Sequence, residues 1–277
     1  MATRTPFSVL MSVYAAENPD FLHQSMGSIF AQTLPTDDFV LVCDGELTPE
    51  LDSVIASFAM DYYSTLKVVK LSTNQGLAAA LNFGLQHCKH DIVARMDSDD
   101  IAMPHRMETQ LAQMAGVDIL GSSVLEFTNH PTDANTIRNT PTTDDAIKKF
   151  ARRRNPFSHP SVMFRKSTVL KAGGYENFPL CEDYQLWVKI FRNGGKGKNI
   201  SDPLLYMRVG NGMYKRRGGF GYLRTMVKFR HWLLKTGFTS MSDFCISVAS
   251  HIVSCFAPSC ARKFMYHSLL RNKISEV

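Results

Sequence analysis

The sequence predicts an α/β fold in which a mostly parallel, twisted sheet is flanked by helices. Apolar runs of strand length and segments of helical periodicity alternate four times within about 100 residues, which is the pattern of βαβ units. Acidic side chains follow the second and fourth of these strands, at Asp44 and from Asp97 to Asp100. Ligands of such sheets bind at the carboxyl ends of the strands, so the same pattern predicts a functional site there.

The elements of this first half follow one another at short intervals. Pro49 suits the first turn of a helix, because its missing amide hydrogen would have no partner at that position. The expected strands span residues 7–14, 38–43, 67–72 and 91–96, and the expected helices span 21–30, a segment from Pro49 onward, and 76–88.

The second half continues the alternation less regularly. Residues 128–143 are polar and rich in turn-forming residues. We expect residues 1–209 to form one domain that ends near Val209. Its expected helices are 105–115, 144–151, Ser167 to Gly173-Gly174 and 182–192, and its expected strands are 117–127 and 161–164.

The composition excludes several classes of protein. Apolar residues make up 44% of the 277 residues, which is enough to fill a core, so the chain is not expected to be disordered. The six cysteines form no C-x-x-C pair, which argues against a zinc site or a disulfide framework and favours a reducing cytoplasmic setting. Neither a secretory signal nor a transmembrane segment is expected from the apolar runs.

The charge is divided unevenly along the chain. From Arg208 to the end there are twelve Lys or Arg and two acids, a net charge of +10, whereas the preceding 207 residues carry a net charge of −4. We therefore expect residues 210–277 to form a basic helical extension. Its stretch 244–257 is too short to span a bilayer, but it can lie at the interface as an amphipathic helix or pack on the domain. An anionic membrane surface is the expected partner rather than nucleic acid, because no RNA-binding signature is present.

Three aspartates lie within four residues at the end of the fourth expected strand. In extended backbone, residues i and i+2 point to the same side, so Asp97 and Asp99 can converge on one point. Magnesium is typically held by one or two carboxylates together with substrate phosphates, so a divalent cation is one interpretation. The other is a solvated turn in which Asp99 or Asp100 caps the helix after Pro104.

Seven segments follow one another across residues 7–209: SVLMSVY, VLVCDGELTPEL, NQGLAAALNFGL, ARMDSDDIAMPHRM, HPSVMFRK, GGY and EDYQLWVKI. Together, and in this order, they resemble the family 2 glycosyltransferases, which have the GT-A fold. Within that family the chain looks most like bacterial enzymes that build capsule, exopolysaccharide or O-antigen units.

This resemblance implies a nucleotide sugar as donor, UDP-linked, and a divalent cation, Mg²⁺ or Mn²⁺. It implies a saccharide or lipid-diphosphate-linked saccharide as acceptor, and a peripheral location on the inner face of the cytoplasmic membrane.

The resemblance also assigns roles in donor binding. Asp44 would accept a hydrogen bond from the imide of the uracil base, although Asp44-Gly45 also fits a simple turn. Asp97 would face the ribose and a metal-bound water, and Asp99 would be the direct metal ligand. Leu81 stands where the family often has Arg, so no diphosphate contact is expected there. The other residues assigned to the nucleotide site are Val13, Tyr14, Asn74, Gly76, Asn82, Arg95 and Ser98.

The catalytic base is placed by the same resemblance in the pair Glu182-Asp183, with Asp183 preferred and Glu182 next. An acceptor hydroxyl would attack the anomeric carbon and lose its proton to this carboxylate as the nucleoside diphosphate leaves from the opposite face. One such displacement inverts the configuration. A purely structural interpretation is that both acids favour the N-terminus of a helix through its dipole.

Three further features keep two interpretations each. His159 either contacts phosphate or acceptor or is structural. Trp187 shares a helix face with Ile190, which favours a core position over stacking on the acceptor. Arg152 to Arg154 form either a solvated face or a contact to a diphosphate-bearing acceptor.

Two other functions are alternatives to a glycosyltransferase. A sugar-phosphate nucleotidylyltransferase shares the α/β layout, but it needs a Gly-rich phosphate loop after the first strand, where Tyr14 to Asn18 stand. A non-catalytic module that binds a membrane surface or nucleic acid would leave the ordered acids Asp44, Asp97, Asp99 and Asp183 without a role.

Overall fold

The computed structural model describes residues 5–210, 219–257 and 272–273. The strands are β1 (Ser8–Val13), β2 (Asp38–Asp44), β3 (Leu66–Leu71), β4 (Ile92–Met96), β5 (Ile101–Ala102), β6 (Ile119–Phe127), β7 (Thr136–Arg138), β8 (Met163–Arg165), β9 (Gly197–Arg208) and β10 (Asn272–Lys273). The helices are α1 (Pro19–Phe30), α2 (Pro49–Asp61), α3 (Leu77–His87), α4 (Arg106–Leu111), α5 (Asp144–Phe150), α6 (Lys166–Lys171), α7 (Glu182–Arg192), α9 (Gly219–Lys235) and α10 (Met241–Phe256). Short 3₁₀ turns lie at Pro131–Asp133 and His159–Ser161.

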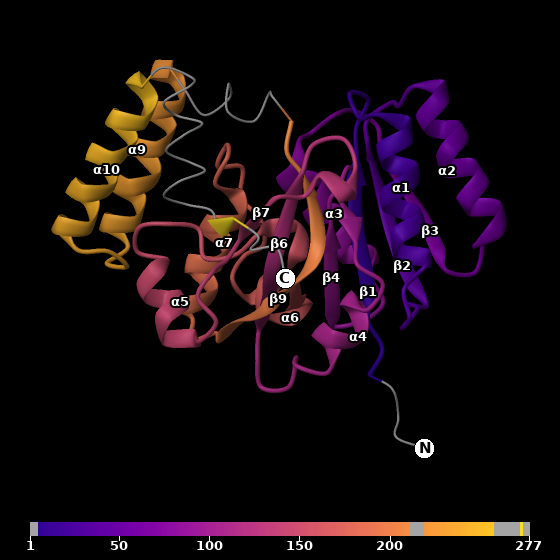
Figure 1. Cartoon of the computed structure of the whole chain (residues 1–277), viewed down its shortest axis with the longest axis horizontal. Coiled ribbons are helices and arrows are strands. Elements are labelled where there is room, and N and C mark those ends of the chain that lie inside the picture. Colours follow the sequence, from indigo (N-terminus) through magenta and orange to yellow (C-terminus); the bar gives the residue numbers. More distant parts are fainter. Residues whose placement is uncertain (1–4, 211–218, 258–271, 274–277) are drawn as a thin grey trace.

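These elements form one twisted sheet with helices on both faces, and α9 and α10 form a pair at one end (Figure 1). The strand order is β10-β7-β6-β8-β4-β1-β2-β3, and β9 pairs with β5 and β6. The strands β4, β1, β2 and β3 are parallel, whereas β8 and β7 run antiparallel to β6. The predicted fold class is therefore confirmed.

The parallel part of the sheet fixes where the functional site lies. β1 pairs with β2 on one side and with β4 on the other, so the carboxyl ends of all three strands meet at one edge. Both β2 and β4 are buried along their whole length, because α1 and α2 cover one face and α3 covers the other. Such continuous apolar strands are what a parallel sheet covered on both faces requires.

The longest strand, β9, is absent from the sequence-based expectation. Its segment is interrupted by Asp202-Pro203, and its pairing with β6 shifts register next to Ser123. A bulge of this kind breaks the two-residue periodicity by which strands are recognised. The helix expected at 105–115 is also shorter than predicted, because α4 ends at Leu111.

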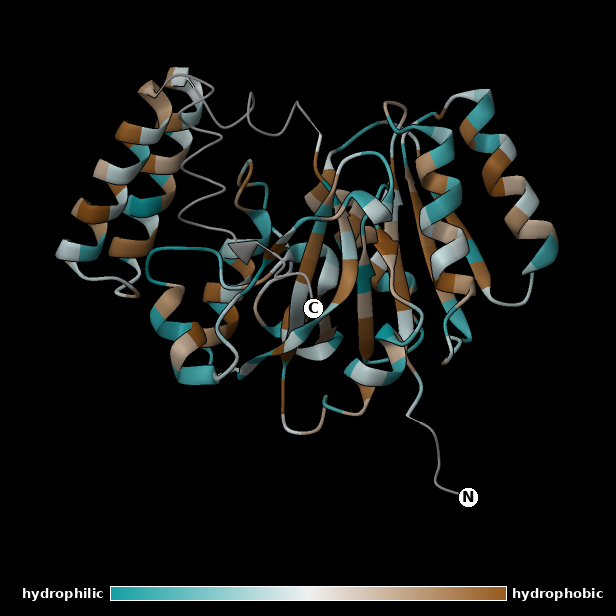
Figure 2. Cartoon of the chain, viewed as in Figure 1, coloured by the Kyte–Doolittle hydropathy of each residue, from teal (hydrophilic) through white to brown (hydrophobic). Residues whose placement is uncertain are grey.

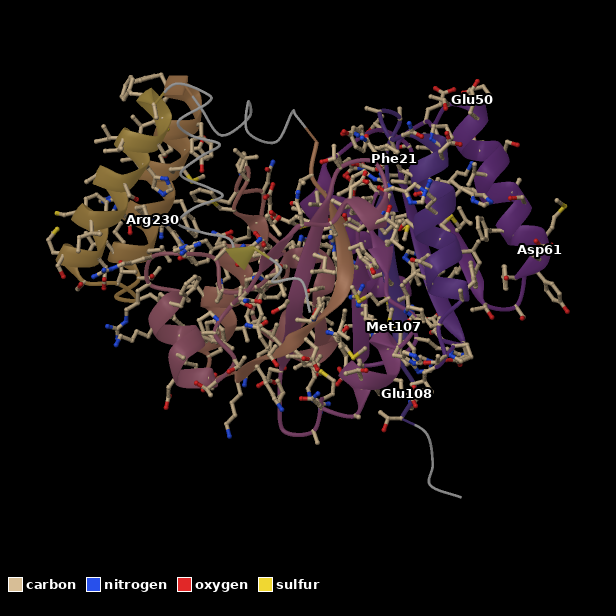
Figure 3. The ribbon with its side chains drawn as sticks, in the orientation of Figure 1. Phe21, Glu50, Asp61, Met107, Glu108 and Arg230 are labelled. Atoms are coloured by element: carbon tan, nitrogen blue, oxygen red, sulfur yellow. The ribbon has the colours of Figure 1, made fainter. Side chains whose placement is uncertain are left out.

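The C-terminal extension packs on the domain through one face of α9. Phe229 and Leu233 are fully buried there, and Arg230 donates through Nη2 to the carbonyl oxygen of Arg153 at 2.6 Å. Figure 3 labels Arg230 on this face. Arg153 in turn donates through Nε to Asp243 Oδ1 of α10 at 2.5 Å. The extension is thus fixed to the domain by both apolar contacts and charged hydrogen bonds.

The outer faces of the two helices differ. On α9 the exposed positions Arg224, Lys228, His231 and Lys235 follow one another at helical spacing. On α10 the exposed large side chains are Met241, Ile246, Ile252, Val253 and Phe256, and Figure 2 shows hydrophobic residues along this helix. Among the described residues, none of the helices combines the length and hydropathy needed to cross a bilayer. The predicted domain boundary near Val209 borders residues 211–218, which lie outside the described part of the chain.

Candidate active site

An acidic cluster lies directly after β4, at the carboxyl edge of the sheet. Oxygens of Asp97, Asp99 and Asp100 all lie within 4.8 Å of one another. Asp97 and Asp99 are partly exposed, whereas Asp100 is buried. The cluster is therefore closed on its Asp100 side and open to solvent on the other.

The end of β9 holds this cluster in place. The backbone amide of Arg208 donates to Asp100 Oδ1 at 2.7 Å, and Arg208 Nε donates to the carbonyl oxygen of Asp99 at 2.9 Å. The guanidinium lies 3.7 Å from the ring centre of Phe21, which Figure 3 labels, and 4.4 Å from that of Phe127. The N-cap residue of α4 is His105, so the interpretation of Asp99 or Asp100 as the cap of that helix is wrong.

The first loop and α1 also contact the cluster. Ser98 Oγ donates to Glu17 Oε2 at 2.5 Å, and Ser25 Oγ of α1 donates to the carbonyl oxygen of Asp97 at 2.7 Å. Ser98 is therefore engaged by Glu17, and its expected contact to the nucleotide stays a prediction. These hydrogen bonds fix the backbone of the acidic segment, while the Asp99 side chain makes none of them.

Burial and the crowding of carboxylates together determine the electrostatics of the acidic cluster. Burial raises the pKa of Asp99 to about 7, and the charges of Asp97 and Glu17 add to the increase. Burial, followed by Asp99 and Asp97, raises the pKa of Asp100 well above its ordinary value. Asp100 Oδ2 is also buried without a hydrogen-bond partner among the described residues. An oxygen-lined, charge-crowded site with an unpartnered oxygen fits a hard divalent cation.

Arg95 is the buried cation beside this cluster. Its Nη2 pairs with Asp97 Oδ1, and only 1% of its side chain is exposed. Its Nε and Nη1 have no hydrogen-bond partner within the described part of the chain. Arg95 thus offers unused donors next to the acidic cluster.

The end of β2 forms the opposite side of the same edge. Asp44 accepts hydrogen bonds from the backbone amides of Gln75 at 2.7 Å and Gly76 at 2.9 Å, and Asn74 Nδ2 donates to its carbonyl oxygen at 3.3 Å. At Gly45, where φ is +88°, a Cβ would lie 2.6 Å from the Asn74 amide nitrogen, so only glycine fits. The Asp44 carboxylate therefore holds the turn that leads into α3.

Asp44 and the acidic cluster are separated by a single strand end. Because β1 lies between β2 and β4, neighbouring strand spacings put them about 10 Å apart. Val13, the last residue of β1, is buried, and the following Tyr14 is 48% exposed. The edge thus carries an exposed aromatic ring between two acidic ends, while contacts of Tyr14, Asp44, Asn74 and Gly76 to a nucleotide remain predictions.

Asn82 is engaged within the protein. Its amide accepts from the Tyr175 amide at 2.9 Å and donates to the Tyr175 carbonyl oxygen at 2.7 Å. A Cβ at Gly174 would lie 2.6 Å from Asn82 Oδ1. Asn82 therefore holds the Gly-Gly-Tyr segment against α3, and a direct nucleotide contact by its side chain remains a prediction.

The first turn of α7 carries the expected base. Asp183 Oδ2 accepts from Asn155 Nδ2 at 2.6 Å, and its Oδ1 accepts from the amide of Tyr184 at 2.7 Å. Burial raises the pKa of Asp183, and the two hydrogen bonds and Arg95 oppose the increase. Burial also raises the pKa of Glu182, which lies partly exposed beside it. The helix-dipole interpretation holds as well, because both acids lie in the first turn of α7.

Tyr175 and Arg95 connect this helix end with the acidic cluster. Burial raises the pKa of Tyr175, and both Asp183 and Asp97 are close enough to raise it further. Arg95 lowers the pKa of Asp183 while it pairs with Asp97. Arg95 and Tyr175 therefore lie within electrostatic range of both Asp97 and Asp183.

The structure gives packing or hydrogen-bond partners to residues in each of the three features that kept two interpretations, which are His159, Trp187 and the run Arg152 to Arg154. His159 Nε2 lies 3.1 Å from Tyr175 Oη, and burial lowers the pKa of His159 well below its usual value, so it is neutral. Trp187 is fully buried and packs edge-on against Phe157, which makes it a core residue. Of the arginine run, Arg153 pairs with Asp243 and Arg154 lies over the Phe150 ring.

Four site residues were not predicted from the sequence. Glu17 and Asn155 stand in loops, and nothing in their local pattern distinguishes them. Arg208 was missed because β9 was missed. Tyr175 stands in the GGY segment that is part of the family resemblance, but no role was assigned to it.

The twisted sheet with an acidic cluster at its carboxyl edge defines the class of protein. The family model described as "Glycosyl transferase family 2" matches residues 8–173, which is more than half of the chain. The chain belongs to this family, as the sequence resemblance indicated, and its fold is GT-A.

Two similar proteins are glycosyltransferases of bacteria. The chain is 39% identical over 275 residues to the Escherichia coli UDP-Gal:alpha-D-GlcNAc-diphosphoundecaprenol beta-1,3-galactosyltransferase, covering 98% of this chain and 99% of that one. It is 39% identical over 238 residues to the amylovoran biosynthesis glycosyltransferase AmsE of Erwinia amylovora, covering 84% of this chain and 88% of that one.

Solved structures share the fold at low identity. A mannosyltransferase from Pyrobaculum calidifontis, in complex with GDP-Man and Mn²⁺, is 16% identical with a TM-score of 0.64, covering 96% of this chain and 81% of that one. S. aureus TarS 1-349 in complex with UDP-GlcNAc is 16% identical with a TM-score of 0.62, covering 93% and 69%.

Proposed function

We propose that this glycosyltransferase transfers galactose from UDP-galactose, with inversion and with a divalent cation, to N-acetylglucosamine carried on a lipid diphosphate. The observation that supports the proposal is electrostatic: Asp97 of the acidic cluster and Asp183 of α7 lie on separate elements, yet both act on the pKa of Tyr175 and both interact with Arg95. The choice of sugar and acceptor comes from the similarity to the E. coli galactosyltransferase over almost the whole of both chains.

The donor is proposed to lie along the carboxyl edge from β2 to β4. The about 10 Å between these strand ends suits a nucleotide, with Asp44 at the base end and the exposed ring of Tyr14 available for stacking. Asp99 and Asp97 would hold Mg²⁺ or Mn²⁺. The cation would neutralise charge on the leaving diphosphate.

The chain's own part in the reaction is proton transfer and positioning. Asp183 accepts the proton of the acceptor hydroxyl, whose oxygen forms the new bond to the anomeric carbon. The bond from that carbon to the diphosphate oxygen breaks, and its electron pair leaves with UDP. Asn155 and the Tyr184 amide keep the Asp183 carboxylate oriented. Because the base and the leaving group act from opposite faces, an α-linked donor gives a β-linkage.

The acceptor's lipid puts the reaction at a membrane surface, which we propose is the inner face of the cytoplasmic membrane. The exposed basic positions of α9 and the exposed apolar face of α10 support this location. Each Lys or Arg near an anionic leaflet contributes about 1 kcal/mol to binding. No nucleic acid is proposed as a partner.

The test is a donor screen with the full chain. UDP-galactose, UDP-glucose and UDP-N-acetylglucosamine are each offered with a synthetic GlcNAc-diphosphate-lipid acceptor, with Mn²⁺, with Mg²⁺ or with a chelator. We expect transfer from UDP-galactose that the chelator abolishes and either metal restores, and a β-linked product by proton NMR.

Three results would count against parts of this proposal. Transfer that persists undiminished in the chelator would contradict the requirement for a divalent cation. An α-linked product would contradict a single displacement with inversion. Release of pyrophosphate from UTP and a sugar phosphate, without transfer from any nucleotide sugar, would favour the nucleotidylyltransferase alternative.

A further inference from the structure

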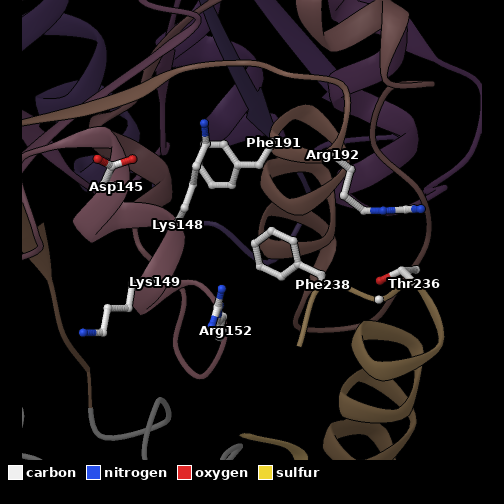
Figure 4. Close-up of a pocket in the computed structure, with 9 residues that line it drawn as sticks. Asp145, Lys148, Lys149, Arg152, Phe191, Arg192, Thr236 and Phe238 are labelled. Atoms are coloured by element: carbon white, nitrogen blue, oxygen red, sulfur yellow. The ribbon is translucent and has the colours of Figure 1, made fainter. Parts of the chain in front are cut away.

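A basic pocket lies where the domain meets the C-terminal extension (Figure 4). Its volume is about 510 Å³, and it lies between α5, the C-terminal end of α7 and the turn from α9 to α10. One acid, Asp145, also lines it. The cationic and aromatic side chains in its wall are Lys148, Lys149, Arg152, Arg192, Phe191 and Phe238.

The positive charges of this basic pocket are only partly balanced. Lys148 Nζ pairs with Asp144 Oδ2 at 2.7 Å. Within residues 5–210 and 219–257, the side chains of Lys149, Arg152 and Arg192 make no hydrogen bond or ion pair, and all three are exposed. Like charges held close together repel one another unless an anion lies between them. The local charge therefore favours an anionic ligand.

The floor of the pocket adds an apolar surface. Phe191 is buried with Lys148 Nζ 5.7 Å from its ring centre, and Phe238 is half-buried. Figure 4 shows the Phe238 ring among the cations of α5 and α7. A small number of charged side chains that converge over aromatic rings is typical of a ligand-binding site. Guanidinium groups suit phosphate because they donate two parallel hydrogen bonds.

This pocket is separate from the donor site. Asp183 and Arg192 lie at opposite ends of α7, nine residues apart, which is about 13 Å along the helix. Asp183 accepts a hydrogen bond from Asn155, whereas Arg192 lines the pocket together with residues of α5 and the extension. Thr236, Gly237 and Phe238 supply the wall from the extension, so an occupant would contact both parts of the protein.

We propose that the basic pocket is a second anion site, which binds a phosphate or diphosphate group. The group can be carried by a soluble molecule or by the headgroup of an anionic lipid, and the shared chemistry is the phosphate. This site is independent of the reaction proposed above.

Calorimetric titration with inorganic pyrophosphate tests the site. A chelator is present, so that no divalent cation can hold pyrophosphate at the acidic cluster. The variant is Arg152→Gln/Arg192→Gln, and the matched control is Lys67→Gln/Lys171→Gln, which removes two exposed charges outside the pocket. We expect the unsubstituted protein and the control to bind pyrophosphate with the same affinity. The pocket variant should bind it at least about tenfold more weakly.

A second arm distinguishes the two sources of phosphate. The same proteins are floated with vesicles of phosphatidylcholine and phosphatidylglycerol. Loss of vesicle binding in the pocket variant, together with displacement of the unsubstituted protein by pyrophosphate, assigns a lipid headgroup. Loss of pyrophosphate binding with unchanged flotation assigns a soluble ligand. Equal behaviour of pocket variant and control in both assays, or no binding of pyrophosphate or vesicles by the unsubstituted protein, overturns the proposal.

Discussion

The two ends of α7 carry opposite charges. This arrangement suits the helix dipole, because acids lie at the N-terminus and bases at the C-terminus. Glu182 and Asp183 stand in the first turn and Lys189 and Arg192 in the last. The ends differ in how their side chains are held. The Asp183 carboxylate accepts two hydrogen bonds, whereas the Arg192 side chain is exposed. A side chain held by fixed partners can orient a reacting group, while an exposed one mainly supplies charge.

This comparison predicts that substitutions of the acids in the proposed active site reduce turnover far more than substitutions at the basic end of α7. The largest effect is expected for Asp99→Asn in the acidic cluster after β4. Because Asp99 is the proposed cation ligand, its loss should weaken cation binding, and losing several kcal/mol of charge stabilisation lowers kcat/KM about 10³-fold or more. Transfer rate and Mn²⁺-dependent UDP binding are measured together.

The matched control for that change is Asp61→Asn, because Asp61 is an exposed acid at the end of α2, far from the sheet edge in Figure 3. Turnover of the Asp99→Asn variant equal to that of the control would remove Asp99 from the cation site.

The next largest effect is expected for Asp183→Asn, which keeps the size of the side chain and removes its basicity. Loss of a positioned base lowers the rate about 10²- to 10⁴-fold, while UDP binding in Mn²⁺ should stay unchanged because Asp183 is not part of the proposed donor site. Glu182→Gln serves as the internal comparison. A larger loss in Glu182→Gln than in Asp183→Asn would assign the base to Glu182.

The parallel half of the sheet and the strand β9 differ in how well the sequence predicts them. The parallel half was readable because β1, β2 and β4 are short apolar runs, and the acids after β2 and β4 follow directly from where those strands end. Arg208 was not readable. It reaches Asp99 and Asp100 across more than 100 residues, from a strand whose bulge and Pro203 hide its periodicity.

Side-chain partners were the second limit. The pattern around Asn82 gave no sign that its amide binds the backbone of Tyr175, and Asn155 gave no sign of its bond to Asp183. Such contacts depend on how loops pack together in three dimensions, while periodicity reports only which face of an element is buried. The extension shows the same limit, because its basic composition did not reveal that Arg230 is buried against the domain.

An intermediate effect at the acidic end is expected from Asn155→Ala. Asn155 donates to the Asp183 carboxylate and opposes the increase that burial causes in its pKa. Without that bond the pKa of Asp183 rises further. Because the base must be deprotonated, kcat/KM should fall on the acidic side and recover at higher pH. The pH profile of kcat/KM checks this shift.

A purely structural loss in Asn155→Ala would lower kcat/KM equally at all pH values, which would contradict the assigned role. Asn155→Ser keeps a hydrogen-bond donor and should restore part of the profile.

The smallest effect is expected where the extension joins the domain, at Asp243→Asn. Burial acts to raise the pKa of Asp243, but hydrogen bonds from Ser240 and Arg153 outweigh it and lower the pKa overall. The stabilisation is therefore present above the ordinary aspartate pKa and is lost as the pH falls through the lowered one. Because half of the Arg153 side chain is exposed, we expect a loss of about 1 kcal/mol in the free energy of unfolding. Urea denaturation should show this difference at neutral pH and its disappearance at strongly acidic pH. A difference that persists in acid would assign the effect to the cap of α10 rather than to the ion pair with Arg153 that joins the extension to the domain.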